Sequence, residues 1–399
     1  MPRFGLLGRR LSHSYSPLLH SRLGDYEYSL YEKEPEEVES FLRLGDFQGL
    51  NVTIPYKKDA LRHCAKLSPA ASATGCVNTV LRLPGGELYG ENTDVFGFEY
   101  LVKDIPAGKT VVFGSGGASR AVRAVWPHAA VISRAGEDNY DNLRKHADAE
   151  VIVNATPVGM YPHGGECPAE LSVFANPRCV VDLIYNPART ELLARAEEMG
   201  VPCRNGLAML AAQAKKSAEL FIGAPLGDNV IESLVSFVAK TTGNIVLIGM
   251  PGCGKTSVGA QLAKLSGRLF ADTDELIAKR ARRPVADILA QDGEGAFRDM
   301  EASALQSVCG ESGLIIATGG GAVTREGNRR VMRQNAVVVY IDTPTDKLAA
   351  EGRPLSAQRG VEALARERLP LYRQWSDITV AFTGARETAK EIYEKVIGD

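Results

Sequence analysis

The stretch that decides the fold of the second half is Asn244-Ile-Val-Leu-Ile-Gly-Met-Pro-Gly-Cys-Gly-Lys-Thr256. A short apolar run ends at Gly249, four residues follow, and the stretch closes on Gly254, Lys255 and Thr256. An amphipathic segment comes next, so a strand, a glycine-rich loop and a helix are predicted in that order. This order is the context that a phosphate-binding loop requires, and it argues against a plain turn beside a solvated lysine.

Such a loop binds a nucleoside triphosphate through its backbone. Its N–H groups surround the phosphates, and the N-terminus of the following helix adds partial positive charge. Lys255 reaches the outer phosphates, and the Thr256 hydroxyl is suited to ligate Mg²⁺. The predicted nucleotide-binding residues are Gly249, Gly252, Cys253, Gly254, Lys255 and Thr256.

The composition is that of a soluble globular protein with two or three domains. The chain has 399 residues, of which 45% are hydrophobic and 24% charged, and its formal net charge is −2. This charge gives no basis for binding nucleic acid or an anionic membrane, and no apolar run is long enough to span one. The N-terminus has no signal-peptide pattern and the seven cysteines are scattered. These features predict reduced thiols in a cytoplasmic protein without a structural metal.

Apolar runs that end in Gly, Asn or Asp alternate with helical patterns along the chain, which is typical of α/β folds with parallel sheets. Three domains are predicted. Residues 1–100 form a substrate domain that is completed by helices in 205–240, residues 101–204 form a Rossmann-like domain, and residues 241–399 form the phosphate-loop domain. The size of the last domain suits a small nucleotide kinase.

A second glycine turn lies in the Rossmann-like domain. The run Thr110–Phe113 is followed by Gly114-Ser-Gly-Gly-Ala118, which opens a helix, as in folds that place a pyrophosphate on a helix N-terminus. A plain strand-to-helix connection is the alternative. The next strand ends at Arg134, where an acidic residue would indicate NAD and an arginine can pair with the 2′-phosphate of NADP; a surface arginine without a ligand also stays open. The predicted cofactor-binding residues are Gly114, Gly116, Gly117, Ala118 and Arg134.

Four short peptides in the first 100 residues carry polar groups suited to a small substrate. They are His13-Ser-Tyr-Ser-Pro17, Asn51-Val-Thr-Ile-Pro-Tyr-Lys57, Gly75-Cys-Val-Asn-Thr79 and Gly90-Glu-Asn-Thr-Asp94. Each peptide alone is explained as well by turn or capping chemistry. Together they offer the hydroxyl, amide, ammonium and carboxylate groups that a polyhydroxylated carboxylate would need.

Taken as a set, these peptides resemble the motifs of the shikimate dehydrogenase family, and the resemblance extends over residues 1–240. It implies reduction of 3-dehydroshikimate to shikimate with NADPH. Lys57 and Asp94 would flank the reacting carbonyl, with Lys57 as proton donor and Asp94 orienting it. Ser14 and Ser16 would bind the substrate carboxylate. The resemblance adds Thr53, Asn78, Thr93, Tyr185 and Gln213 as substrate-binding residues, and Thr156 and Met160 as residues near the nicotinamide.

The sequence departs from this family at two places. About 40 residues separate Gly114 from Asn154, which predicts that the cofactor domain lacks a helix and, with it, a strand. The family's Asn-Arg-Thr cofactor motif is Ser133-Arg134-Ala135 here, so the arginine alone is retained. Both departures bear on cofactor affinity and on the preference for NADP.

Further polar features follow the phosphate-binding loop in the second half. They are Asp272 and Asp274 at a strand end, Arg298 on a predicted helix, Gly319-Gly320-Gly321 after a buried strand, and the later cations Arg353 and Arg368. Taken singly, each arginine fits a surface salt bridge. Several cations around one phosphate-binding loop favour a site for a small anion.

In this order the features resemble the shikimate kinase family over residues 243–399. The resemblance implies phosphorylation of shikimate by ATP, with Lys255 at the phosphates and Thr256 and Asp272 at Mg²⁺. Asp274 would bind the shikimate hydroxyls and act as base. Arg353 would reach over the transferring group from a lid, which is short because Arg368 follows only 15 positions after Arg353; we expect this to affect nucleotide affinity. The implied contacts to the shikimate carboxylate and ring are Arg298, Gly319, Gly320, Gly321 and Arg368.

The product implied for the first half is the substrate implied for the second. The chain is therefore predicted to be a bifunctional enzyme of aromatic amino acid biosynthesis that uses NADP(H), ATP and Mg²⁺ on 3-dehydroshikimate and shikimate. Two alternatives stay open: a metabolite-sensing regulator derived from such enzymes, and an NAD-dependent quinate/shikimate dehydrogenase in the first half. The intact polar residues argue against the regulator.

Overall fold

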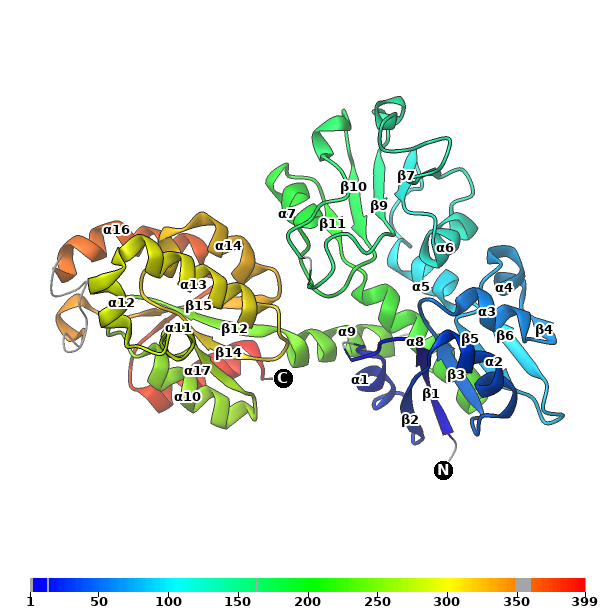
Figure 1. Ribbon diagram of the computed structural model, residues 1–399, viewed down its shortest axis with the longest axis horizontal. Coiled ribbons are helices and arrows are strands. Elements are labelled where there is room, and N and C mark those ends of the chain that lie inside the picture. Colours follow the sequence, from blue (N-terminus) through cyan, green and yellow to red (C-terminus); the bar gives the residue numbers. More distant parts are fainter. Residues whose placement is uncertain (1–2, 13, 163, 228, 349–359, 399) are drawn as a thin grey trace. The chain divides into compact units, whose positions relative to one another are not determined.

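The computed structural model describes residues 3–12, 14–162, 164–227, 229–348 and 360–398. The chain divides into two compact units, residues 1–238 and 239–399, and the boundary lies inside helix α9 (Asn229–Thr242) (Figure 1). Each unit has its own hydrophobic core around mainly parallel sheet. The predicted α/β class is confirmed, whereas the finer domain boundaries stay predictions.

The first sheet of unit 1 has six strands in the order β2-β1-β3-β5-β6-β4. Their bounds are Arg3–Gly8 (β1), Glu27–Glu32 (β2), Gly49–Val52 (β3), Lys66–Leu67 (β4), Thr79–Arg82 (β5) and Leu88–Glu91 (β6). Strand β5 runs antiparallel to β3 and β6, and the other pairs are parallel. All four residues of β3 are buried, as is usual for a strand in the interior of a covered sheet.

Helices surround this sheet and carry several of the predicted site residues. They are α1 (Ser16–His20), α2 (Pro35–Leu44), α3 (Lys57–Arg62), α4 (Pro69–Thr74) and α5 (Thr93–Leu101), joined later in the chain by α8 (Leu207–Ile222). Helix α5 packs along α8, and α8 also contacts β5, so the chain returns to the first sheet at α8. Phe98 and Leu101 on α5 are buried in one hydrophobic cluster with Met209 on α8, which explains this packing.

The second sheet of unit 1 has five parallel strands in the order β11-β10-β9-β7-β8. The strands are Thr110–Phe113 (β7), Ala130–Ile132 (β8), Val151–Asn154 (β9), Cys179–Asp182 (β10) and Cys203–Arg204 (β11), with helices α6 (Gly117–Val125) and α7 (Glu191–Glu198). A full Rossmann sheet has the order 3-2-1-4-5-6. The observed order corresponds to 2-1-4-5-6, so the third strand is missing.

The segment between β8 and β9 shows where the missing part belongs. Its only regular element is the short 3₁₀ turn η1 (Leu143–His146), and no α-helix occurs there. The predicted loss of a helix and a strand from the cofactor domain is therefore confirmed. Strand β8 becomes an edge strand, and the ring of Tyr140 stacks on Phe113 with 5.9 Å between centroids.

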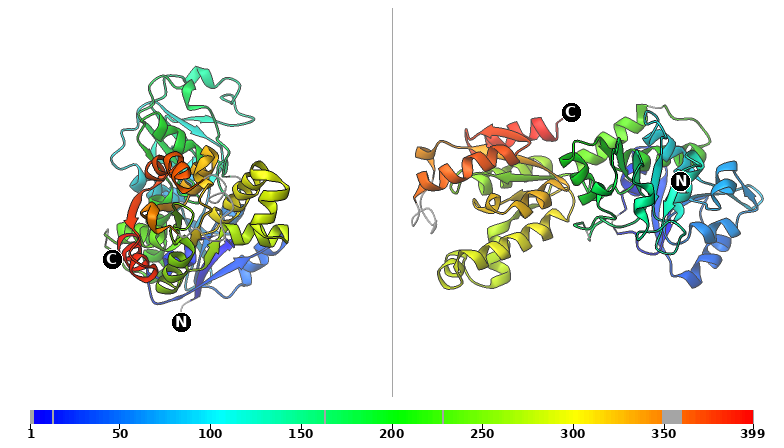
Figure 2. Two further views of the ribbon diagram at one scale, coloured as in Figure 1. Left: turned by 90° about the vertical axis from the view of Figure 1, so that its left-hand side faces the viewer. Right: turned by 90° about the horizontal axis from the view of Figure 1, so that it is seen from above.

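Unit 2 is one five-stranded parallel sheet in the order β13-β14-β12-β15-β16, with helices on both faces (Figures 1 and 2). Its strands are Asn244–Ile248 (β12), Phe270–Asp272 (β13), Ile315–Ala317 (β14), Ala336–Asp342 (β15) and Ile378–Ala381 (β16). Its helices are α10 (Lys255–Ser266), α11 (Thr273–Ala281), α12 (Val285–Gln291), α13 (Gly293–Cys309), α14 (Glu326–Arg333), α16 (Val361–Trp375) and α17 (Ala385–Val396). Strand β12 is fully buried at the centre and leads directly into the phosphate-binding loop.

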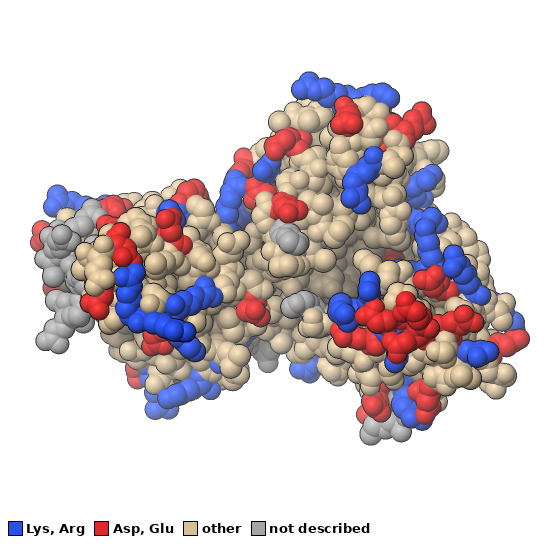
Figure 3. Space-filling model, viewed as in Figure 1, with Lys and Arg blue, Asp and Glu red and all other residues tan. Residues whose placement is uncertain are grey.

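The formal net charge of the whole chain is only −2. Acidic and basic side chains both occur on each unit on the face drawn in Figure 3. Among the described residues, no helix combines the length and apolar character that crossing a membrane requires.

Candidate active sites

The reacting pair predicted in unit 1 is brought together by two helix starts. Lys57 is the first residue of α3, and Asp94 lies in the first turn of α5, where the Asn92 side chain accepts a hydrogen bond from Asp94 N (3.1 Å). Lys57 Nζ lies 2.5 Å from Asp94 Oδ2, and Asn78 Nδ2 donates to Asp94 Oδ1 over 2.9 Å. Both carboxylate oxygens are occupied, so the position of the ammonium group is fixed.

A buried wall of amides and hydroxyls adjoins this pair. Asn78 Oδ1 accepts from Thr93 N over 2.7 Å, and Thr93 Oγ1 lies 3.1 Å from Asn78 Nδ2 and 3.5 Å from Gln213 Oε1. The structure therefore places Asn78, Thr93 and Gln213 together, and their contacts to a substrate stay predictions. Three residues without a predicted role complete the wall: Asn51 on β3, Thr79 on β5 and Ser217 on α8.

The other residues predicted to bind substrate lie on the first turns and loops of unit 1. Ser14 Oγ accepts from Ser16 N over 3.2 Å at the start of α1. The Tyr185 ring lies beside that of Tyr15, with 5.2 Å between centroids, and burial raises the pKa of Tyr185 to about 12. Thr53 is half-buried directly after β3. The contacts of these residues to a substrate stay predictions.

The predicted cofactor turn lies where the strand order of the second sheet reverses. Strands β7 and β9 are neighbours there, with Phe113 paired to Asn154. Gly114 follows β7 with φ +98°, and a Cβ on it would lie 2.9 Å from Thr156 Cγ2. Because only glycine suits this conformation and contact, the turn stays close to the end of β9. Thr156 Oγ1 in turn donates to Asn154 Oδ1 over 2.7 Å.

The start of helix α6 offers room for a pyrophosphate. Gly116 is the N-cap, no side chain caps the helix, and its first turn, which includes Ala118, contains no acidic residue. A Cβ on Gly116 would meet nothing within 4 Å, whereas one on Gly117 would lie 3.4 Å from Lys57 Cδ. The backbone donors at this helix start therefore fit a dinucleotide and lie next to the reacting lysine.

Arg134 and Met160 lie at the periphery of this cofactor edge. Arg134 follows β8, is exposed, and forms no hydrogen bond or ion pair with any residue that the structure describes. Its charge acts on the Tyr140 hydroxyl, whose pKa is raised by burial and lowered by Arg134. Met160 is 44% exposed. Both side chains are available to a ligand, and their roles stay predictions.

Asp182, the last residue of β10, binds residues next to the cofactor turn, although no role was predicted for it. Its carboxylate is fully buried and accepts from Asn154 Nδ2 (3.0 Å), Thr190 Oγ1 (2.6 Å) and Ile184 N (3.1 Å). Burial raises the pKa of Asp182 to about 6. Asp182 thereby holds the Asn154 side chain in place, and Asn154 Oδ1 in turn accepts from the Thr156 hydroxyl.

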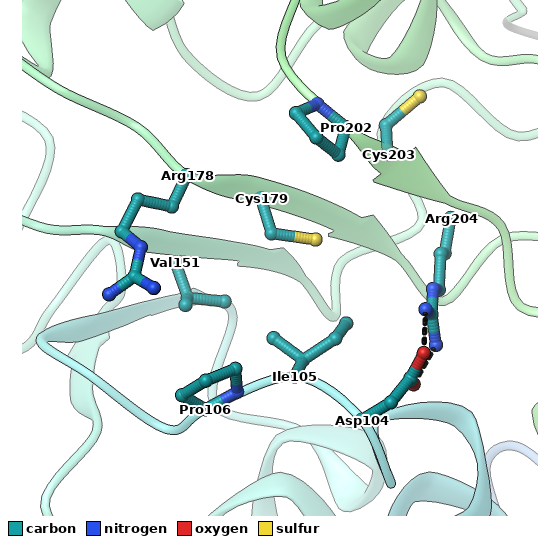
Figure 4. A pocket seen from close by; sticks show the side chains of 9 residues that line it. All are labelled: Asp104, Ile105, Pro106, Val151, Arg178, Cys179, Pro202, Cys203 and Arg204. Carbon is teal, nitrogen blue, oxygen red and sulfur yellow. Dashed lines mark hydrogen bonds and ion pairs between the residues drawn. The ribbon is translucent and has the colours of Figure 1, made fainter.

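A small cavity of about 220 Å³ in unit 1 lies away from these groups. Figure 4 shows it around the first residues of β9, β10 and β11, which is the edge opposite the cofactor turn. Arg204, its main cation, is held by Asp104 through two contacts of 2.6 Å. This cavity is therefore separate from the predicted site.

The phosphate-binding loop of unit 2 holds its own lysine. Lys255 Nζ donates to Gly249 O (2.8 Å) and Met250 O (3.0 Å) and lies 3.7 Å from Cys253 Sγ. These carbonyls satisfy the ammonium group inside the curve of the loop, where phosphate oxygens would compete for it. The residues present fit a nucleoside triphosphate.

Thr256 and Asp272 fit the predicted Mg²⁺ position. Thr256 Oγ1 donates to Asp272 Oδ2 over 2.7 Å, while Asp272 Oδ1 caps α11 by accepting from Asp274 N (3.0 Å). No group of three or more His, Cys, Asp or Glu side chains suited to a metal occurs in the described part of the chain. The ion would therefore be held by one hydroxyl, one carboxylate and the nucleotide phosphates, as Mg²⁺ commonly is.

The predicted acceptor site of unit 2 gathers buried charges on α13 and α16 against the three glycines. A Cβ on Gly321 would overlap the guanidinium of Arg298, so glycine is required there for the arginine to approach the backbone. Arg298 Nη1 donates to Glu301 Oε2 over 2.8 Å. A Cβ on Gly319 would lie 2.9 Å from Asp274 Oδ1, and the Tyr372 hydroxyl donates to Gly320 O. These contacts place Arg298, Asp274 and the glycines together.

Arg368 and Glu301 are the most deeply buried charges of this site. Their exposures are 1% and 0%. Among the described residues, Arg368 Nε and Nη2 and Glu301 Oε1 have no hydrogen-bond partner. Burial raises the pKa of Glu301, and Arg298 opposes this shift. Buried guanidinium N–H groups without a hydrogen-bond partner are the donors that a small anionic ligand needs. Arg353 and the predicted lid lie outside the described residues.

Known protein families match the sequence of each unit. A family model described as shikimate dehydrogenase substrate binding domain matches residues 6–80, and one described as shikimate kinase matches residues 251–398. A shikimate dehydrogenase (NADP(+)) of Clostridium beijerinckii is 31% identical over 267 residues, covering 59% of this chain and 97% of the relative.

Two solved structures are also similar. Shikimate 5-dehydrogenase from Thermus thermophilus, in complex with NADP(H) and shikimate, is 31% identical with TM-score 0.53, covering 59% of this chain and 98% of its own. Shikimate kinase from Acinetobacter baumannii, in complex with shikimate, is 34% identical with TM-score 0.38, covering 41% and 97%. The assignment of the second unit therefore rests on the family model alone.

Fold and sites together define a protein with a dinucleotide-binding oxidoreductase unit followed by a P-loop kinase unit. More particularly, the chain belongs to the shikimate dehydrogenase family through its first unit and carries a shikimate kinase domain in its second. It is therefore an enzyme of the shikimate pathway.

Proposed function

We propose that this chain catalyses two successive reactions, the NADPH-dependent reduction of 3-dehydroshikimate to shikimate and the Mg²⁺- and ATP-dependent phosphorylation of shikimate to shikimate 3-phosphate. The observation that carries the proposal is that each unit brings several of its predicted reacting groups within contact distance. Unit 1 has the Lys57–Asp94 pair at 2.5 Å, and unit 2 has Lys255, Thr256 and Asp272 on one loop and strand end.

In the first reaction the chain provides the proton. NADPH, when bound at the turn after β7, provides hydride transfer to the carbonyl carbon. Lys57 gives a proton from Nζ to the carbonyl oxygen as the carbonyl becomes an alcohol, and Asp94 holds that ammonium in place. Asn78, Thr93 and Gln213 orient the ring hydroxyls from the buried wall.

In the second reaction the chain mainly positions and neutralises charge. ATP, when bound with Mg²⁺ at the phosphate loop, provides the phosphoryl group. Lys255 balances the charge on the outer phosphates, and Asp274 accepts the proton of the attacking hydroxyl. Arg298 and Arg368 hold the shikimate carboxylate, for which the buried donors of Arg368 are suited.

The test is an assay of the full chain with 3-dehydroshikimate, NADPH and ATP, followed by identification of the products. We expect NADPH oxidation, ADP formation and shikimate 3-phosphate. A metabolite-sensing regulator would bind these ligands without turnover. A quinate/shikimate dehydrogenase using NAD would oxidise quinate with NAD, so both substrates and both cofactors are assayed.

Cofactor preference is expected to depend on Arg134. Replacing Arg134 with alanine should raise the KM for NADPH about tenfold and leave that for NADH unchanged, since the lost contact is a charged hydrogen bond to the 2′-phosphate. Steady-state kinetics with both cofactors measures this. The control is Arg144→Ala, an exposed arginine of the same connection. Equal use of NADP and NAD by the unaltered chain would show that Arg134 does not recognise the phosphate.

We expect Asp274 to act on the acceptor hydroxyl and Asp272 to bind Mg²⁺, so that a substitution of Asp274 affects phosphorylation and not ATP binding. Asp274→Asn should leave ATP affinity unchanged and slow phosphorylation on the order of 10²-fold or more, because the general base is lost. Calorimetry with ATP and Mg²⁺, combined with kinase rates, measures both. Asp287→Asn, an exposed aspartate on α12, is the control. Loss of ATP affinity in Asp274→Asn would mean that the roles of Asp272 and Asp274 must be exchanged.

A further inference from the structure

Ser217 occupies the centre of the buried wall in unit 1. It lies on α8 one turn after Gln213 and is fully buried. Its hydroxyl donates to Gln213 O over 2.9 Å, the backbone carbonyl four residues earlier, which is the usual bond of a serine inside a helix. The proton of Ser217 is thereby committed to its own helix, and both lone pairs of Oγ face the sheet.

These lone pairs receive groups from three other elements. Asn51 Nδ2 on β3 donates to Ser217 Oγ over 2.8 Å. Thr79 Oγ1 on β5 and Thr93 Oγ1 on α5 lie 3.0 Å and 3.1 Å from the same oxygen. A serine oxygen has two acceptor positions. After Asn51 takes one of them, one threonine proton can take the other.

The remaining bonds decide which threonine donates to Ser217. Asn78 Oδ1 accepts from Thr93 N (2.7 Å), and the hydroxyls of Thr79 and Thr93 both lie 3.2 Å from it. Thr93 Oγ1 already accepts from Nδ2 of the same amide (3.1 Å), so its proton cannot also point at Oδ1, and the second position of Oδ1 goes to the Thr79 hydroxyl. Asn51 Nδ2 also lies 3.2 Å from Thr79 Oγ1 and can donate to it. Every group is satisfied when Thr79 donates to Asn78 and Thr93 donates to Ser217. The Thr93 proton then points away from the site.

This arrangement sets what Thr93 presents to a ligand. One lone pair of Thr93 Oγ1 faces Asn78 Nδ2 at 3.1 Å, and the other is used by no bond of this network. The second proton of Asn78 Nδ2 goes to Asp94 Oδ1 at 2.9 Å, beside the ammonium of Lys57. Ser217 is thus linked through Thr93 and Asn78 to the reacting pair without facing the substrate itself.

We propose that Ser217 is a positioning residue of the dehydrogenase site, which orients the Thr93 hydroxyl as an acceptor for one ring hydroxyl of the substrate. The proposal rests on the dehydrogenase function proposed above. Without the Ser217 oxygen, the Thr93 proton loses its buried acceptor and turns toward Gln213 or the substrate, so the polarity of the contact changes.

The experiment uses Ser217→Ala in the full chain and measures NADP-dependent oxidation of shikimate. We expect KM for shikimate to rise about tenfold, the scale of one lost hydrogen bond, with kcat changed less than about threefold. The control is Thr110→Val. Thr110 is the first residue of β7, at the end of the strand away from the cofactor turn, and its buried hydroxyl donates to Ala107 O. The substitution should lower thermal stability without changing KM. Kinase activity of unit 2 reports the amount of chain in every sample.

Shikimate analogues that each lack one ring hydroxyl separate positioning from general loosening. For the analogue without the hydroxyl that Thr93 accepts, the KM difference between the unaltered chain and Ser217→Ala should disappear. An equal rise in KM for every analogue would overturn the proposal, as would an unchanged KM for shikimate. A chain without any NADP-dependent activity would overturn the proposed function as well, so the two failures are distinct.

Discussion

Replacing Lys57 with alanine is expected to lower kcat for reduction of 3-dehydroshikimate on the order of 10²–10⁴-fold, the usual contribution of a positioned acid. Lys57 Nζ lies 2.5 Å from Asp94 Oδ2 and beside the predicted cofactor turn, so no other ammonium among the described residues shares that position. KM should change far less, because the substrate hydroxyls are held by the wall of amides and hydroxyls. Steady-state NADPH oxidation measures both constants.

Two controls make this result specific. Lys58→Ala removes the exposed neighbouring lysine from the same helix and should leave kcat unchanged. Lys57→Arg keeps the positive charge but replaces the ammonium with a guanidinium, which does not release its proton near neutral pH. The kcat of Lys57→Arg should therefore also be low. Near-normal turnover in Lys57→Ala would contradict the assignment, and recovery in Lys57→Arg would mean that Lys57 acts through its charge alone.

The contiguous parts of both sites could be predicted from the sequence. The phosphate loop depends on residues 249–256 and on the strand and helix beside them, which local patterns indicate well. The shortened cofactor domain could also be predicted, because 40 residues cannot hold two helices and two strands. The order 2-1-4-5-6 then identifies the missing strand as the third, which only the pairing of strands reveals.

The buried residues that hold the reacting groups in place could not be predicted in the same way. Asn51, Thr79, Thr93 and Ser217 come from β3, β5, α5 and α8, so their proximity depends on tertiary packing and not on spacing. A serine inside a helix carries no local sign of such a role. Glu301 is different, because it lies three positions after Arg298, the spacing at which helical side chains meet. That spacing was a usable signal for this buried ion pair.

Replacing Lys255 with alanine is expected to reduce phosphoryl transfer to shikimate below detection. Removal of one charged donor from a developing negative charge commonly costs on the order of 10²–10³ in rate, and the phosphate-loop lysine contacts the group that is transferred. Its buried ammonium lies inside the phosphate-binding loop, where it donates to Gly249 O and Met250 O. ATP affinity should fall less than the rate, because the backbone N–H groups of the loop remain.

The dehydrogenase unit provides the internal control for this variant. Lys255→Ala should oxidise NADPH at the unaltered rate in the same sample, which shows that loss of kinase activity is not loss of protein. Lys264→Ala, an exposed lysine in the last turn of the same helix, should keep both activities. If Lys255→Ala still formed shikimate 3-phosphate at a normal rate, the loop would not be the site of transfer. The proposal of two reactions in one chain would then be reduced to the first.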